Sequence, residues 1–181
     1  MEQAVIAGGC FWCTEAVFEE LEGVISAESG YAGGTKETAD YKTVSAGKTK
    51  HAEAIRITYD PEVIPYEALL HIHFATHDPT QLNRQGADVG PHYRSAIFVA
   101  NETEEATVRR VMSELTAENA FSGPIVTTVE RGAFYPAESY HQNFVCENPT
   151  QGYVLAVAMP KVEKVRKLFK ERLKKESPLN R

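Results

Sequence analysis

The sequence has little cysteine. Its 181 residues include three, Cys10, Cys13 and Cys146, which are too few and too unevenly spaced for a disulfide scaffold. It lacks an apolar run long enough to cross a bilayer, and its first residues show neither the basic nor the apolar segment of a signal peptide. We therefore expect a cytoplasmic protein, and in that compartment a cysteine pair is more often catalytic or metal-binding than structural.

The chain also lacks an overall excess of basic residues, since 19 Lys and Arg stand against 25 Asp and Glu. Basic residues gather only in residues 160–181, where nine Lys and Arg face three Glu. Apolar residues from Val162 to Leu173 recur there at helical spacing, so we expect an amphipathic helix at about 160–176. The acidic remainder argues against nucleic acid as the main partner.

No internal repeat, low-complexity tract or linker is present, so we expect a single domain over residues 1–181. Strands are expected over residues 3–7, 24–31, 52–59, 95–100, 125–130 and 153–159. Helices are expected over residues 10–21, 65–76 and 102–119. Because some strands follow one another without a long crossover, this order favours an α+β, two-layer sandwich with a mixed sheet and a ferredoxin-like plait core. Residues 32–50, 77–94 and 132–149 form long loops, which are usually functional.

The stretch GGCFWCTEAVF, residues 8–18, places Cys10 after a strand and a double glycine, at the start of a helix. A thiol there lies near unpaired backbone N–H groups and the positive end of the helix dipole, which stabilise the nucleophilic thiolate. Cys13 lies one turn later on the same face. This spacing suits attack by one thiol and resolution by the other, and it equally suits two ligands of a zinc site.

Two other functions fit the cysteine pair. A zinc-stabilised binding module needs four ligands, and the sequence offers no second Cys-x-x-Cys. The histidines that could complete such a site are His71, His73, His77 and His141. A thioredoxin-like disulfide oxidoreductase has the same cysteine spacing, but Phe11 and Trp12 resemble a pocket wall more than an exposed exchange site. Both alternatives remain open from the residues alone.

Five blocks of sequence resemble one known family in the same order. GCFWCTE resembles the signature of the A-type peptide methionine sulfoxide reductases. The other four blocks are GYAGG (30–34), GKTKHAEAIRITYDP (47–61), HDPTQLNRQGADVGPHYRS (77–95) and FYPAESYHQNF (134–144). Together they cover most of the chain from Gly8 to Tyr153, so the resemblance does not depend on a single motif.

The resemblance implies a thiol-dependent enzyme that repairs oxidised methionine. Such an enzyme reduces methionine S-sulfoxide, free or in peptides and proteins, to methionine. The Cys10 thiolate attacks the sulfoxide sulfur and becomes a sulfenic acid, and a second thiol then condenses with it to a disulfide. Thioredoxin reduces that disulfide. No metal or organic cofactor is implied, and no membrane or nucleic acid takes part.

The resemblance also implies a proton donor. Glu53 matches the family's acid, a carboxylic acid that burial keeps neutral near pH 7. From the sequence alone, Glu53 could equally be a solvated strand residue paired with Arg56.

Further site residues follow from the same match. Tyr41 and Tyr93 match two pocket tyrosines that hold the sulfoxide oxygen. Asp88 matches an aspartate that hydrogen-bonds within the site. Phe11 and Trp12 match the apolar wall that accepts the S-methyl group of the substrate.

One departure from the family concerns the resolving thiol. Many relatives carry it directly after a tyrosine near the C-terminus, but here Val154 follows Tyr153. Cys13 and Cys146 remain as resolving cysteines. We favour Cys13, because neighbouring helical turns can bring two thiols within disulfide distance, and a relay through both stays open.

Overall fold

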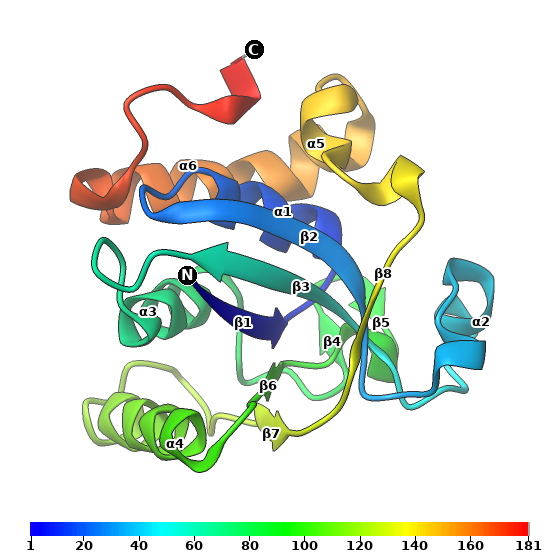
Figure 1. The fold of residues 1–181 in the computed structure, drawn as a ribbon, viewed down its shortest axis with the longest axis horizontal. Coiled ribbons are helices and arrows are strands. Elements are labelled where there is room, and N and C mark those ends of the chain that lie inside the picture. The colour runs from blue at the N-terminus through cyan, green and yellow to red at the C-terminus, as the bar shows by residue number, and fades with distance from the viewer. Residues whose placement is uncertain (181) are drawn as a thin grey trace.

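A curled six-stranded mixed sheet forms the centre of the computed structural model, which describes residues 1–180. Its strand order is β7-β6-β1-β3-β2-β8 (Figure 1). The strands are β1 (Glu2–Ala7), β2 (Val24–Ala32), β3 (Ala52–Tyr59), β6 (Ala96–Phe98), β7 (Thr128–Glu130) and β8 (Phe134–Pro136). Neighbours pair antiparallel except β6 and β7, which are parallel. A separate small hairpin joins β4 (Arg84–Gln85) and β5 (Asp88–Val89).

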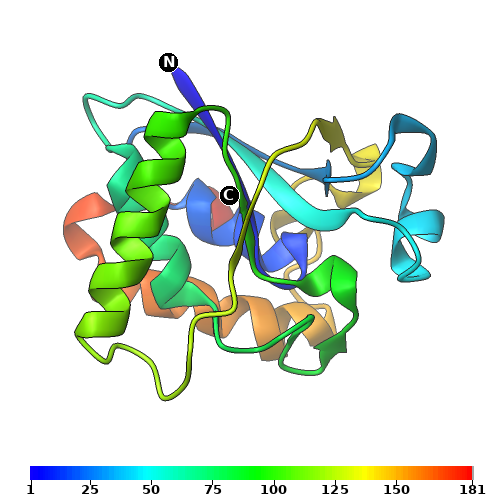
Figure 2. The same ribbon diagram turned by 90° about the horizontal axis from the view of Figure 1, so that it is seen from below.

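Helices form a layer on one side of the sheet. The α-helices are α1 (Phe11–Glu19), α2 (Tyr41–Ser45), α3 (Tyr66–Thr76), α4 (Glu102–Ala117), α5 (Phe144–Glu147) and α6 (Met159–Leu168). Figure 2 shows α1, α3 and α6 under the sheet, and α6 packs against both of the others. Within residues 1–180 the structure has no helix that is both long and apolar enough to cross a membrane. The molecule is thus a mixed α/β fold with most of its core between sheet and helices.

Strand β3 lies in the interior of the sheet, and both of its faces are buried. Ile55 and Ile57 point into the main core against the helices, whereas Ala52 and Ala54 belong to a small cluster on the opposite face. Side chains alternate along a strand, so Glu53 falls on the helix side with the two isoleucines. A carboxyl group on this face is forced into the core beneath α1.

The expected strands 3–7, 24–31 and 52–59 and the helices 65–76 and 102–119 are confirmed to within a few residues. The expected strand over 153–159 is wrong, because the chain there is helical, with a π-helical turn at Val154–Ala158 that runs into α6. Val154 and Ala158 are buried while Leu155 is exposed. That spacing of four is the burial pattern of a helix, and a short apolar run alone does not reveal it.

The C-terminal helix expected at 160–176 also needs correction, because α6 ends at Leu168. The following segment turns back and pairs with the end of α1. The backbone N–H of Glu22 donates to Arg172 (2.7 Å), and that of Lys174 donates to Glu20 (2.8 Å). These bonds satisfy main-chain groups beyond α1, which a continued helix could not reach.

Candidate active site

The double glycine lets α1 begin directly against the loop between α3 and β6. Gly9 has φ +82°, a left-handed conformation that L side chains rarely adopt. A Cβ at Gly9 would lie 2.8 Å from Cγ of Gln85, and one at Gly8 would lie 2.8 Å from the His73 ring. Only glycine fits at both positions. Cys10 follows as the N-cap residue of α1, in extended conformation.

Glu53 lies buried directly beside this helix start. Its side chain is 2% exposed, and Oε1 accepts a hydrogen bond from the backbone N–H of Phe11 at 3.1 Å. That N–H is one of the donors that a helix N-terminus leaves without an intrahelical partner. Arg56 bonds Glu28 instead, with Nη2 2.5 Å from Oε2. Glu53 is therefore not the solvated ion-pair partner that the sequence also allowed.

Burial is the main reason why Glu53 is a weak acid here. It raises the pKa of Glu53 to about 8, helped by the negative charges of Asp88 and Cys13 and opposed by the Phe11 hydrogen bond. Desolvation acts in this direction because it disfavours the charged form. Glu53 thus carries a proton at neutral pH and can donate it.

The surroundings of the two neighbouring thiols shift their pKa values in opposite directions. Cys10 is 8% exposed and Cys13 is fully buried. Burial raises the pKa of Cys10, and Cys13 and Glu53 raise it further, whereas the Trp12 backbone N–H lowers it. Hydrogen bonding to the Cys10 thiol lowers the pKa of Cys13, with help from the charge of Lys161. Burial thus opposes the Cys10 thiolate that the helix start is expected to favour.

The backbone N–H groups at the start of α1 serve both reacting groups. That of Phe11 is directed at Glu53, and that of Trp12 lowers the pKa of Cys10, against the larger effect of burial. The helix terminus thus positions the acid. A Cys10 thiol that burial keeps protonated needs a neighbouring group to take its proton.

Three polar residues named from the sequence come to the same place from separate segments. Tyr41 begins α2, Asp88 lies on β5, and Tyr93 lies in the turn before β6. Burial raises the pKa of both tyrosines, and the charges of Glu53, Cys10 and Asp88 raise it further. All three residues are therefore electrostatic neighbours of the Cys10–Glu53 pair.

Tyr153 joins the site although the sequence did not assign it a role. Its hydroxyl donates to Oδ2 of Asp88 at 2.5 Å, and Sγ of Cys13 lies 3.8 Å from that hydroxyl oxygen. The sequence does hold an indication of this role, because Tyr153 directly precedes Val154, the position at which many relatives carry the resolving cysteine. The hydroxyl connects Asp88 to the buried thiol.

The two aromatic residues between the cysteines have different surroundings. The Phe11 ring is 1% exposed and packs in the core, with its centroid 5.7 Å from that of Tyr31. Trp12 is half-buried and stacks on Phe144 with centroids 3.6 Å apart. Its Nε1–H donates to Nδ1 of His141 at 3.0 Å. The sequence suggests His141 only as a metal ligand. In the structure its hydrogen bond with Nε1 of Trp12 fixes the plane of the indole ring.

The third thiol, Cys146, forms its hydrogen bond with the C-terminal segment and not with Cys10 or Cys13. It belongs to α5, and its thiol donates to the backbone carbonyl of Pro178 at 3.6 Å. Cys146 is half-buried, and all three cysteines are free thiols. A bond from Cys146 to Cys10 would require the C-terminal segment to release it.

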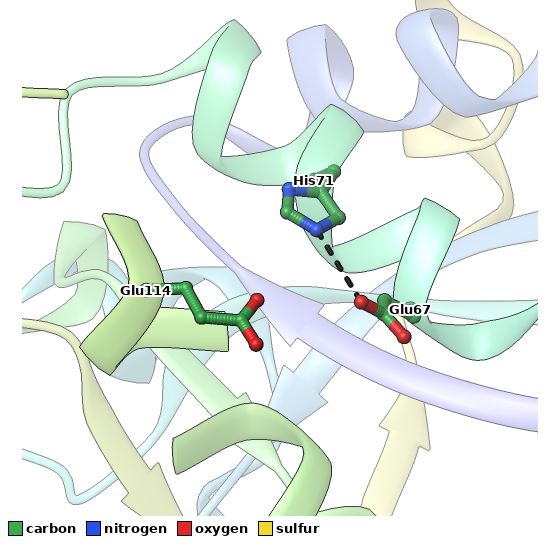
Figure 3. Close-up of side chains that lie close together, drawn as sticks. All are labelled: Glu67, His71 and Glu114. Carbon is green, nitrogen blue, oxygen red and sulfur yellow. Dashed lines mark ion pairs between the residues drawn. The ribbon is translucent and has the colours of Figure 1, made fainter. Parts of the chain in front are cut away.

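Within the described residues, one group of side chains has its possible ligand atoms close enough together to hold a metal ion. It consists of Glu67, His71 and Glu114. Figure 3 shows them between α3 and α4, with His71 paired to Glu67 at 3.7 Å. Arg110 bonds Glu67 at 2.8 Å and Glu114 at 3.1 Å. The guanidinium already pairs with both carboxylates, so the cluster is an exposed ion-pair network.

Two buried acids make stability depend on pH. The pKa of Glu15, which accepts bonds from Ser29 and Asn143, is about 7, and that of Glu53 is about 8, both raised by burial. Their stabilisation is complete below pH 4.5 and is lost as the pH rises through 7 to 8. We expect the unfolding free energy of the Glu53→Gln variant to fall by about 4 kcal/mol less than that of the wild type between pH 5 and 8.5.

Urea denaturation at several pH values measures this difference. Glu28→Gln, which removes a half-exposed carboxylate on β2, is the control and should follow the wild type. Equal slopes for Glu53→Gln and wild type would contradict the buried acid.

A thiol at a helix start, a second thiol one turn away and a buried protonated carboxyl group define a thiol-based oxidoreductase. Comparison with known proteins gives the particular family. The sequence model described as peptide methionine sulfoxide reductase matches residues 2–173, and the chain belongs to that family.

Individual relatives agree with this assignment. The peptide methionine sulfoxide reductase MsrA of Deinococcus radiodurans is 54% identical over 174 residues, covering 96% of this chain and 84% of that protein. Among solved structures, Mxr1 from Saccharomyces cerevisiae in reduced form has a TM-score of 0.77 at 31% identity, covering 83% of this chain and 87% of that one. Methionine sulfoxide reductase A of Corynebacterium diphtheriae gives 0.72 at 32% identity, over 83% and 76%. Mxr1 is also known in complex with Trx2, a structure that matches at 22% identity and a TM-score of 0.55.

Proposed function

We propose that this protein reduces methionine S-sulfoxide, free or in proteins and peptides, to methionine, with Cys10 as the nucleophile. The observation that carries the proposal is the buried, protonated Glu53, hydrogen-bonded to the residue that follows Cys10. Sulfoxide reduction needs a thiol at the sulfur and a proton for the departing oxygen. The two groups lie side by side at the start of α1.

In the first step Sγ of Cys10 attacks the sulfoxide sulfur while Glu53 protonates the oxygen. The proton of the Cys10 thiol passes to the carboxylate that Glu53 becomes. The oxygen leaves with Cys10 as a sulfenic acid, and methionine is released. Tyr41 and Tyr93 hold the oxygen by their hydroxyls, Asp88 orients the neighbouring Tyr153, and Trp12 with Phe11 forms the wall for the S-methyl group.

In the second step Cys13 condenses with the sulfenic acid to form a disulfide and water. Its place one turn from Cys10, its buried thiol and its lowered pKa support it over Cys146. In a single turnover without reductant, we expect Cys13→Ser to form methionine and stop at the Cys10 sulfenic acid. Cys146→Ser should form a Cys10–Cys13 disulfide as the wild type does. Mass spectrometry after dimedone trapping distinguishes these products, and a stalled Cys146→Ser enzyme would reassign the resolving thiol.

The external reductant follows from the chemistry of the product. A disulfide is reset by a dithiol of lower potential, and we propose thioredoxin, supported by the complex of the related protein Mxr1 with Trx2. Methionine sulfoxide in oxidised proteins is the other partner. The cysteine usage supports a cytoplasmic location, and the chemistry requires no metal or organic cofactor.

We infer that β1, α1, β2, β3, α3 and β6 form a ferredoxin-like plait, with α6 added to the helix layer. The central strand order β6-β1-β3-β2 with antiparallel neighbours supports this. The continuous core around these elements supports one catalytic domain.

A substrate assay tests the function. Reduced protein is given the S and R epimers of an N-acetyl methionine sulfoxide amide separately, with thioredoxin, its reductase and NADPH. We expect turnover of the S epimer and none of the R epimer. Reduction of insulin disulfides without sulfoxide turnover would replace the proposal by a disulfide oxidoreductase.

A further inference from the structure

Glu15 is a buried carboxyl group of α1 that takes no part in the proposed reaction. Only 2% of the residue is exposed. Its Oε2 accepts a hydrogen bond from the Ser29 hydroxyl of β2, and its Oε1 accepts one from the backbone N–H of Asn143. Because burying a polar group is costly unless it is hydrogen-bonded, these two bonds are what allows the carboxyl group to lie in the core.

The bond to Asn143 reaches the segment of residues 137–143, which joins β8 to α5 and is called the β8–α5 loop below. Asn143 has φ +54°, a left-handed conformation that is uncommon outside glycine. A chain keeps such a conformation where the surrounding contacts hold it, and the hydrogen bond to Glu15 is one of these contacts. Glu15 therefore holds the end of the loop against α1.

A second set of hydrogen bonds ties the same loop to β2 at Ser29. The side chain of Gln142 accepts from the Ser29 N–H (2.9 Å) and donates to the Ser29 carbonyl (2.8 Å). The backbone N–H of Ala137 donates to that carbonyl as well (2.9 Å). Ser29 thus bonds the loop through its main chain and Glu15 through its hydroxyl, so helix, strand and loop form one connected network.

The β8–α5 loop also carries the groups that hold Trp12. His141 accepts the hydrogen bond of the indole N–H at 3.0 Å, and Phe144, directly after the loop, stacks on the indole with centroids 3.6 Å apart. Trp12 lies three residues before Glu15 on α1, so both side chains lie on one face of the helix. The loop sets the position of the indole ring, and Glu15 sets the position of the loop.

We propose that Glu15 is a positioning residue for substrate recognition, which holds the β8–α5 loop against α1 and thereby fixes Trp12 as a wall for the S-methyl group. This inference rests on the proposed function. A well-packed apolar pocket distinguishes substrates that differ by one methylene by about tenfold or more. Glu15 therefore determines how well the pocket distinguishes a methyl sulfoxide from an ethyl sulfoxide.

Glu15→Met tests this role, because it keeps the length of the side chain and a good helix former but has no oxygen to accept the Asn143 N–H. In single turnovers with N-acetyl methionine S-sulfoxide amide, we expect the half-saturating substrate concentration to rise about tenfold. The limiting rate of methionine release should change by less than about twofold, since the reacting groups are untouched. The preference for this substrate over its ethyl analogue should fall about tenfold.

Fluorescence gives a second readout that does not depend on turnover. Trp12 is the only tryptophan of the chain, so its emission reports on the wall directly. In the folded, substrate-free Glu15→Met protein, we expect the emission to move to longer wavelength and acrylamide to quench it more strongly, because a loosened loop admits water to the indole.

Two variants serve as controls. Glu15→Gln should follow the wild type, because the amide oxygen can accept from the backbone N–H of the loop and the amide nitrogen can donate to the Ser29 hydroxyl. Glu20→Met removes another buried carboxyl group, at the other end of α1, which is bonded to Arg166 and Ser177. It should lower the stability of the protein without changing half-saturation, methyl preference or emission.

The outcomes decide between a positioning role and a merely structural one. Raised half-saturation, reduced methyl preference and shifted emission in Glu15→Met, with a wild-type Glu15→Gln, support the inference. Wild-type values in folded Glu15→Met overturn it, as do a fall in the limiting rate alone, the same changes in Glu20→Met, or a Glu15→Gln that behaves like Glu15→Met.

A milder variant covers the case in which Glu15→Met does not fold. Ser29→Ala removes one of the two bonds to the carboxyl group and keeps the main-chain bonds to Gln142. It should raise the half-saturating concentration about threefold and shift the Trp12 emission in the same direction, and wild-type values here would overturn the inference. If the reduced wild type forms no methionine, the proposed function itself fails, whereas the emission still shows whether Glu15 holds the loop.

Discussion

The Cys10→Ser variant is expected to lose sulfoxide reduction completely, with no methionine above background in single or multiple turnovers. A serine hydroxyl is a far weaker nucleophile than a thiol and cannot form the sulfenic acid that carries the oxygen away. The substitution is small, and Cys10 is the N-cap of α1, a position that serine favours. The fold should therefore persist, which circular dichroism and Trp12 fluorescence can verify.

Cys146→Ser is the matched control for this experiment, since it removes a thiol that is bonded to the Pro178 carbonyl, away from the helix start. It should keep a full first turnover. Methionine formation by folded Cys10→Ser protein would contradict the role of Cys10, and it would direct attention to Cys13 as the nucleophile, the thiol with the lowered pKa.

The Glu53→Gln variant is expected to slow the first step by a factor of about 10² to 10³, the range for loss of a general acid. An amide can still accept the Phe11 N–H bond, which keeps the helix start in place, but it has no proton to transfer. The pKa of Glu53 is about 8 in the folded protein. The wild-type rate of methionine release should therefore fall as the pH rises through 8, and the variant should lose this dependence.

Rapid-quench measurement of methionine release from pH 6 to 10 tests both parts of this prediction. Glu28→Gln, on the neighbouring strand and paired with Arg56, is the control and should behave as the wild type does. A Glu53→Gln enzyme with a wild-type rate and pH profile would exclude Glu53 as the proton donor.

Periodicity located the main elements because their patterns are local. Strand β3 was predicted over 52–59, as the structure has it, because its apolar run ends at a clear Asp-Pro turn. The segment 153–159 could not be assigned in this way, since a short apolar run fits a strand or a helix equally. Only packing decided it, by burying Val154 and Ala158 together.

The residues of the candidate site were named from motifs, but their electrostatics were not accessible from the sequence. The position of Cys10 at a helix start predicts a stabilised thiolate, whereas burial, which the sequence does not reveal, raises the pKa of that thiol. Tyr153 and His141 were missed as site residues because their roles depend on contacts across more than 60 residues of sequence.

The stoichiometry of one turnover tests sulfoxide reduction by Cys10 and Cys13. Fully reduced protein is mixed with a small excess of methyl S-sulfoxide substrate at pH 7 without reductant, and methionine and disulfides are counted. We expect about one methionine per enzyme, together with one Cys10–Cys13 disulfide. A reduced, folded protein that releases no methionine would contradict it.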